Sequence, residues 1–85
     1  MPGALKEDAL RVMVTRDGQV YLCDSHLMYG DLTDEIRERV RNGAEKKVYL
    51  AVDARAKYGD AKAVLDQIRM AGIGNVSFLT EEPYR

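Results

Sequence analysis

Few of the devices that hold small domains together are available to this 85-residue chain. It contains one cysteine and one histidine, Cys23 and His26, and no tryptophan. A disulfide requires a pair of cysteines, and a structural zinc site requires several Cys or His ligands, so the sequence predicts neither. A chain of this length buries only about 60% of the surface that it exposes when unfolded. Its stability must therefore come from a modest apolar core or from a partner.

The sequence also lacks an excess of charge and a long apolar run. Its 13 Lys and Arg residues nearly balance its 14 Asp and Glu residues, which gives a formal net charge of −1. Nucleic-acid binding requires a basic surface, so we expect no nucleic-acid partner. No apolar run approaches the roughly 20 residues of a membrane helix, and no targeting leader precedes the first pattern. The sequence as given therefore predicts a soluble chain.

Alternating apolar residues predict a β-hairpin near the start of the chain. Residues 1–9 have no periodicity and are expected to form a flexible linker or tail. Residues 10–15 and 19–23 alternate apolar and polar side chains, as half-buried strands do. Asp17-Gly18 lies between them, and glycine accepts the positive φ of a tight turn. We therefore expect these two segments to pair antiparallel.

Apolar residues spaced about four apart predict two helices, each followed by a strand. The first helix is expected to begin after Asp31, which is placed to cap it, and to end at the next Asn-Gly pair. The second is expected over residues 58–70. Strands are expected over residues 48–52 and 75–79, and the compact connection between these two strands predicts that they pair in parallel.

Together these elements predict an α/β (α+β) two-layer sandwich, in which a mixed sheet carries both helices on one face in the order β-β-α-β-α-β. Alternation directs one set of side chains toward the helices: Val12, Val14, Val20, Leu22, Val48, Leu50 and Val52. The opposite set consists of Met13, Tyr21, Cys23, Tyr49 and Leu79. The opposite set is more apolar than a solvated face, so we expect it to contact a second copy or a partner.

Polar and aromatic residues follow the expected strand 48–52: Asp53, Arg55, Lys57, Tyr58 and Asp60. Sheets in α/β proteins place ligands at this end of a strand. However, acid-base or nucleophilic catalysis needs a second group, and the sequence supplies neither a second histidine nor a triad. We therefore predict no catalytic residue, no cofactor and no metal site. Asp53 is expected to end the strand, and Tyr58 and Gly59 to begin the helix that follows.

The single histidine and the single cysteine do not by themselves indicate a catalytic mechanism. His26 lies beside a serine between the hairpin and the first helix, where a histidine is usually a surface or packing residue. Cys23 ends the second alternating segment, so we expect it to be buried in a strand as a small hydrophobe.

Several short motifs, in the same order and spacing, resemble the periplasmic domain of the ExbD/TolR family of biopolymer transport proteins. The likeness covers residues 10–82 and is most specific in VYLAVDARAKYGDAKAVLDQIRMAGIGNVSF. There an apolar strand ends in Asp53, Tyr58-Gly59 follows five residues later, and Ala-Gly-Ile leads into the last strand. VTRDGQVYL is similar to the family's first hairpin and GDLTDEIRERV to its first helix. Val52 departs from the family, which usually has alanine there.

The resemblance implies a binding and coupling domain rather than an enzyme. It implies a soluble periplasmic domain over residues 10–82, followed by a short tail over residues 83–85. Family members are anchored in the inner membrane by an N-terminal helix that carries an essential aspartate. Neither feature is in this sequence, so the resemblance implies that the proton chemistry lies outside this chain.

The resemblance also implies partners. It implies a homodimer that relays motion from an ExbB/TolQ-like membrane subunit to a TonB-like energy transducer, with an ExbD-like role favoured. Two alternatives stay open: a TolR-like module of the Tol–Pal system that associates with peptidoglycan, and a small-molecule-binding domain that uses the corner between Asp53 and Asp60.

The last expected strand is the predicted partner-binding segment. An exposed sheet edge can add a strand from another chain, with backbone hydrogen bonds for affinity and alternate side chains for specificity. The family has a similar last strand, and here that strand is terminal and carries the only phenylalanine. We expect Phe78 to anchor the partner. The segment consists of Asn75, Val76, Ser77, Phe78 and Leu79.

Overall fold

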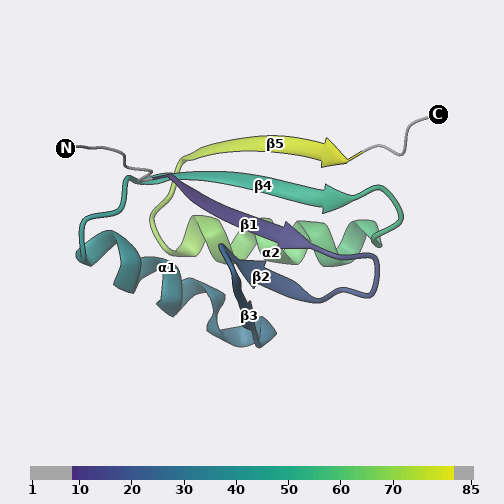
Figure 1. Ribbon diagram of the computed structural model, residues 1–85, viewed down its shortest axis with the longest axis horizontal. Coiled ribbons are helices and arrows are strands. Elements are labelled where there is room, and N and C mark those ends of the chain that lie inside the picture. Colours follow the sequence, from purple (N-terminus) through teal and green to yellow (C-terminus); the bar gives the residue numbers. More distant parts are fainter. Residues whose placement is uncertain (1–8, 82–85) are drawn as a thin grey trace.

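The computed structural model describes residues 9–81, and Figure 1 shows their arrangement. The elements are β1 (Leu10–Val14), β2 (Val20–Leu22), β3 (Ser25–Leu27), the short 3-10 helix η2 (Tyr29–Asp31), α1 (Leu32–Arg41), β4 (Lys47–Asp53), α2 (Tyr58–Met70) and β5 (Asn75–Glu81). The predicted tail over residues 83–85, and all but Ala9 of the predicted tail over residues 1–9, lie outside the described residues.

The five strands form one mixed sheet in the order β3-β2-β1-β4-β5. β2 pairs antiparallel with β1 and β3, whereas β4 pairs parallel with β1 and β5. The predicted α+β class, hairpin and parallel pair are thereby confirmed. The predicted order β-β-α-β-α-β is wrong in one respect, because it omits β3. This strand has only three residues, which is too short for alternation to reveal it.

Hydrogen bonding in the turn between β1 and β2 explains why glycine stands at position 18. The N–H of Gly18 donates to the carbonyl oxygen of Thr15 at 2.9 Å, and the N–H of Thr15 donates to that of Gln19 at 3.0 Å. Gly18 has a φ of +83°, a left-handed conformation that glycine adopts without steric cost. A Cβ at this position would lie 2.8 Å from Oδ2 of Asp60. The turn therefore lies against the first turn of α2.

The prediction that Cys23 is buried in a strand is wrong. Cys23 is exposed, lies in the turn between β2 and β3, and has a φ of +57°. Its N–H donates to the carbonyl oxygen of Arg11 at 2.7 Å. The alternating segment thus continues one residue beyond the point at which the chain turns back, and the pattern alone does not reveal that point.

Both helices lie where the sequence places them. Glycines with positive φ follow each one, Gly43 with +114° after α1 and Gly72 with +91° after α2. Asp31 occupies the position before α1, but its side chain makes no capping hydrogen bond, contrary to the prediction. Its backbone instead belongs to η2. The helices are joined by a hydrogen bond of 3.0 Å from Oγ1 of Thr33 to the carbonyl oxygen of Gln67.

The apolar core lies on one face of the sheet. β1 alternates buried and exposed residues along its whole length, so only one of its faces is covered. Strands and helices contribute to one buried cluster: Leu10, Val12, Val14, Val20, Leu22, Leu32, Ile36, Val48, Leu50, Val64, Ile68 and Ile73. Each of these side chains gains about 1.5–3 kcal/mol from leaving water. Val52, which alternation assigns to this face, is half-buried.

Gly18→Ala should destabilise the fold more than Gly72→Ala. Both glycines have a left-handed φ, which costs an alanine about 1–2 kcal/mol. Only at Gly18 does an added Cβ also meet a side chain, since nothing lies within 4 Å of a Cβ at Gly72. Urea unfolding of the two variants measures the difference in the free energy of unfolding. Equal losses would show that the carboxylate of Asp60 moves aside for the added Cβ at no cost.

Candidate functional site

The longest exposed edge of the sheet is β5. It hydrogen-bonds to β4 on one side only, and the sheet ends there (Figure 1). β5 has seven residues, whereas β3, at the opposite edge, has three. An edge strand presents N–H and C=O groups that another strand can pair with. Among the described residues, β5 is therefore the place at which a further strand fits best.

Exposed apolar side chains stand on both faces of β5. Phe78 pairs with Leu50 of β4, which is fully buried, so its side chain lies on the helix side of the sheet. It is nevertheless 57% exposed, because the helices leave this edge uncovered. Leu79 pairs with Ala51 on the opposite face and is 49% exposed. A strand added along β5 would contact both side chains.

The rest of the predicted segment is less exposed or more polar. Val76 pairs with the buried Val48 and packs against the core, so it holds β5 in place. Ser77 pairs with Tyr49 on the opposite face and is half-buried. Asn75 is exposed at the start of the strand. Phe78 and Leu79 thus carry most of the free apolar surface of the segment.

Asp53 ends β4 by folding its carboxylate back onto the chain. Oδ1 accepts a hydrogen bond of 2.8 Å from the backbone N–H of Arg55, and Nε of the same arginine lies 3.4 Å away. The N–H of Ala56 donates to the carbonyl oxygen of Asp53 at 2.9 Å and closes the turn. The backbone N–H of Arg55 is the main cause that lowers the pKa of Asp53. The carboxylate therefore serves the turn, as aspartates often do after strands.

The other corner residues do not converge with Asp53. Tyr58 begins α2 with its side chain 81% exposed, and Gly59 has open space where a Cβ would stand. Asp60 lies against Gly18 of the hairpin instead. The sequence places these residues together along the chain, but the structure gives them separate surroundings.

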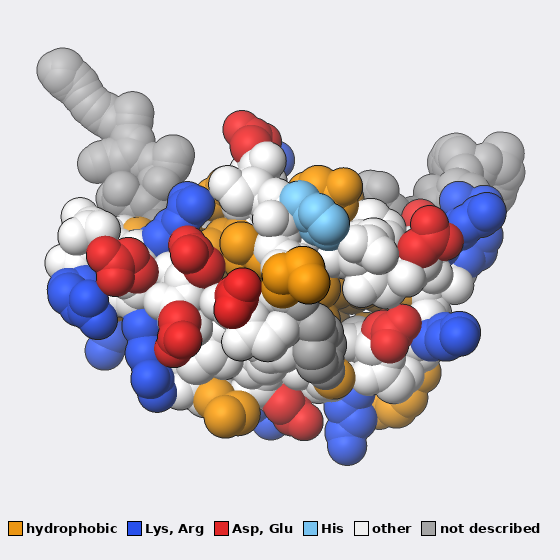
Figure 2. All heavy atoms as spheres, turned by 90° about the horizontal axis from the view of Figure 1, so that it is seen from below, with side chains coloured by type: hydrophobic (Ala, Val, Ile, Leu, Met, Phe, Trp, Pro, Cys, Tyr) orange, Lys and Arg blue, Asp and Glu red, His pale blue; other side chains and the backbone are white. Residues whose placement is uncertain are grey.

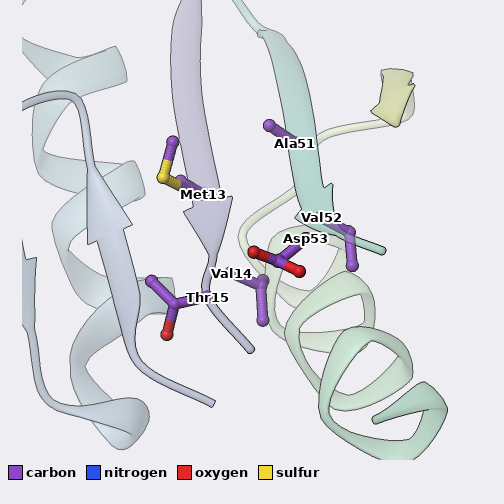
Figure 3. Close-up of a pocket in the computed structure, with 6 residues that line it drawn as sticks. All are labelled: Met13, Val14, Thr15, Ala51, Val52 and Asp53. Atoms are coloured by element: carbon purple, nitrogen blue, oxygen red, sulfur yellow. The ribbon is translucent and has the colours of Figure 1, made fainter. Parts of the chain in front are cut away.

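A small pocket lies between the carboxyl ends of β1 and β4 (Figure 3). Its lining consists of Met13, Val14, Thr15, Ala51, Val52 and Asp53. Its volume is about 60 Å³. Sites for small organic ligands are several times larger. Neither Tyr58 nor Asp60 lines it, so this pocket does not support the small-molecule alternative.

The remaining residues weighed from the sequence form no reactive group. His26 is exposed on β3, with Nε2 2.6 Å from Oε1 of Gln19 and its ring centroid 4.9 Å from that of Tyr21. Within residues 9–81, no three His, Cys, Asp or Glu residues are grouped as metal ligands would be. None of the helices in this range has the length and apolar character needed to cross a membrane. Both acidic and basic side chains are exposed on the face that carries α1 (Figure 2).

Comparison with protein families gives a match. The model of the family described as biopolymer transport protein ExbD/TolR matches residues 3–82, which is almost the whole chain. No curated protein matches the chain.

The carboxyl of Asp53 should titrate below its ordinary pKa of 3.8, as measured by NMR of its side-chain carbon. Because folding stabilises the ionised form, this contribution to stability is present above the unfolded pKa and is lost as the pH falls through the folded pKa. Arg55→Ala should retain most of the lowering, since the main donor is a backbone N–H. A midpoint at or above 3.8, or complete loss of the lowering in Arg55→Ala, would contradict this assignment.

Proposed function

The chain belongs to the ExbD/TolR family of biopolymer transport proteins, and we propose that it relays the motion of a proton-driven membrane motor to a TonB-like partner. The family acts in energy transduction for transport rather than in catalysis, and its members are membrane-anchored with a periplasmic domain. In this proposal the described domain works in the periplasm as a homodimer. An ExbB/TolQ-like subunit drives it, and the partner is held at a sheet edge.

The observation that carries this proposal is the free edge of β5. Seven residues of strand have a neighbour on one side only, which is enough length for several backbone hydrogen bonds to an added strand. A coupling protein must bind its partner and release it without unfolding. Strand addition allows this, because each net hydrogen bond contributes only about 0.5–1.5 kcal/mol and the affinity depends on the number of residues that pair.

Phe78 supplies the main apolar contact in the proposed complex. A phenylalanine buries about 150–250 Å² when fully covered. Phe78 is 57% exposed, so covering this exposed part removes roughly 110 Å² from water. At about 25 cal/mol per Å², this burial contributes about 2–3 kcal/mol to the binding free energy. The side chain of Phe78 lies on the helix side of the sheet and that of Leu79 on the opposite side. A partner strand would therefore contact an apolar side chain on each of its faces.

Phe78→Ala should weaken binding of an extended TonB-like segment by roughly 30-fold or more, which corresponds to about 2 kcal/mol. The monomer should stay folded, since Phe78 is outside the buried cluster. Fluorescence titration measures the affinity, and circular dichroism with thermal melting checks the fold.

Met28→Ala is the matched control, because Met28 is 70% exposed beside β3, at the opposite edge of the sheet. It should leave the affinity unchanged. Equal affinities of the two variants would reject the β5 edge as the binding site. Binding to purified peptidoglycan with no binding to the TonB-like segment would reject the relay and favour the TolR-like alternative.

A further inference from the structure

A positive charge lies beside the amino end of β5, on the face of the sheet that is turned away from the helices. Lys47 of β4 precedes the buried Val48, so it lies on this face, and it pairs with Asn75, the first residue of β5. Its Nζ is 5.0 Å from the ring centroid of Tyr49, which pairs with Ser77. A cation is attracted to the face of an aromatic ring, so Tyr49 holds the ammonium group close to β5.

A second positive charge lies near the same end of β5, on the helix side. α2 ends at Met70, and residues 71–74 lead from it into β5, so the last turn of α2 lies beside the start of that strand (Figure 1). Arg69 is in this last turn and is exposed. α1 packs on one flank of α2, where Oγ1 of Thr33 donates to the carbonyl oxygen of Gln67. Arg69 is about 200° around the helix from Gln67, which places it on the flank away from α1, toward β5.

Neither Lys47 nor Arg69 is paired with a carboxylate of residues 9–81. The ion pairs in this range are Arg16 with Asp17, Arg41 with Glu38, and Arg55 with Asp53. The free edge therefore has positive charge on both faces at its amino end. The exposed apolar side chains of Phe78 and Leu79 follow further along the strand.

We propose that the strand added to β5 carries acidic side chains at the end beside Asn75, where Lys47 and Arg69 bind them, and apolar side chains opposite Phe78 and Leu79. The inference rests on the proposed function and deepens it, because it states which partner sequences the edge selects. Backbone hydrogen bonds to an edge strand supply affinity for any sequence, so the selection comes from side chains on the two faces.

The geometry of a sheet allows these contacts. Neighbouring strands are about 4.8 Å apart, so an added strand would lie about 10 Å from β4. A lysine on β4 and a glutamate on the added strand extend toward each other across β5, and only the small Ser77 lies between them. Successive residues of a strand point to opposite faces. Two consecutive acidic residues therefore direct one carboxylate toward Lys47 and the other toward Arg69.

These charges are expected to act mainly on selectivity. Exposed pairs of opposite charge contribute little each and are screened by salt, whereas backbone hydrogen bonds and apolar contacts depend little on salt. Two such pairs should make an acidic segment bind roughly five- to tenfold more tightly than its neutral counterpart at low ionic strength.

A set of peptides with blocked ends tests the charge preference. The acidic probe is Thr-Glu-Glu-Val-Leu-Thr-Thr, the neutral probe has glutamine in place of both glutamates, and the basic probe has lysine there. Titration followed by the NMR shifts of the β5 amides measures dissociation constants into the millimolar range. The acidic peptide should bind roughly five- to tenfold more tightly than the neutral one, and the basic peptide most weakly. Raising the ionic strength should remove these differences.

Charge-reversal variants identify the residues responsible. Lys47→Glu or Arg69→Glu alone should abolish the preference for the acidic peptide, and the double variant should prefer the basic peptide. A merely structural role of either residue would not reverse the preference. Arg16→Glu is the matched control, because it makes the same change of charge in the exposed turn between β1 and β2, at the opposite end of the sheet. It should keep the preference of the wild type, and thermal melting checks that each variant folds.

Equal affinities of the wild type for the acidic and neutral peptides at low ionic strength would overturn this inference, and so would a double variant that still prefers the acidic peptide. Either result leaves the β5 edge as the partner site. Failure of the proposed function gives a different result. In that case no peptide shifts the β5 amides, or Phe78→Ala binds every peptide as tightly as the wild type does, which rejects the edge and this inference together.

Discussion

Two helices cover only one face of the five-stranded sheet, and the rest of the structure depends on this constraint. All the buried apolar side chains therefore gather on one side. The opposite face and the edge at β5 are left with apolar groups that the described residues do not cover, namely Met13, Phe78 and Leu79. These are the surfaces on which the functional proposals rest.

The corner after β4 illustrates how a polar cluster can serve the fold. Its aspartate and arginine are near each other because they lie in one turn, and the carboxylate is occupied by a backbone N–H. The tyrosine beside them points into solvent. Such a corner fixes where α2 begins, and through α2 it fixes where β5 joins the sheet. In the proposed function its contribution is therefore geometric, because it positions the edge to which a partner strand would add.

Much of the fold could be predicted because local signals agree. The hairpin follows from alternation around Asp17-Gly18, and both helices follow from apolar spacing ended by glycine. The errors have local causes as well. β3 is too short to show a period, and Cys23 continues an alternation whose strand has already ended. The side chain of Asp31 does not cap α1 as expected, because the short helix η2, which ends at Asp31, leads directly into α1.

The sequence by itself determined which segments become strands and helices, which side chains enter the core, and the order and spacing of motifs that mark the family. Only the tertiary structure decided that β1 pairs with β4 and which strands lie at the edges of the sheet. Alternation places Phe78 on the same side as Leu50, yet one is exposed and the other fully buried, because β5 lies at an edge beyond the reach of the helices. Strand register likewise joins residues that are far apart in the chain, as in the row across the sheet that consists of His26, Tyr21, Met13, Ala51 and Leu79.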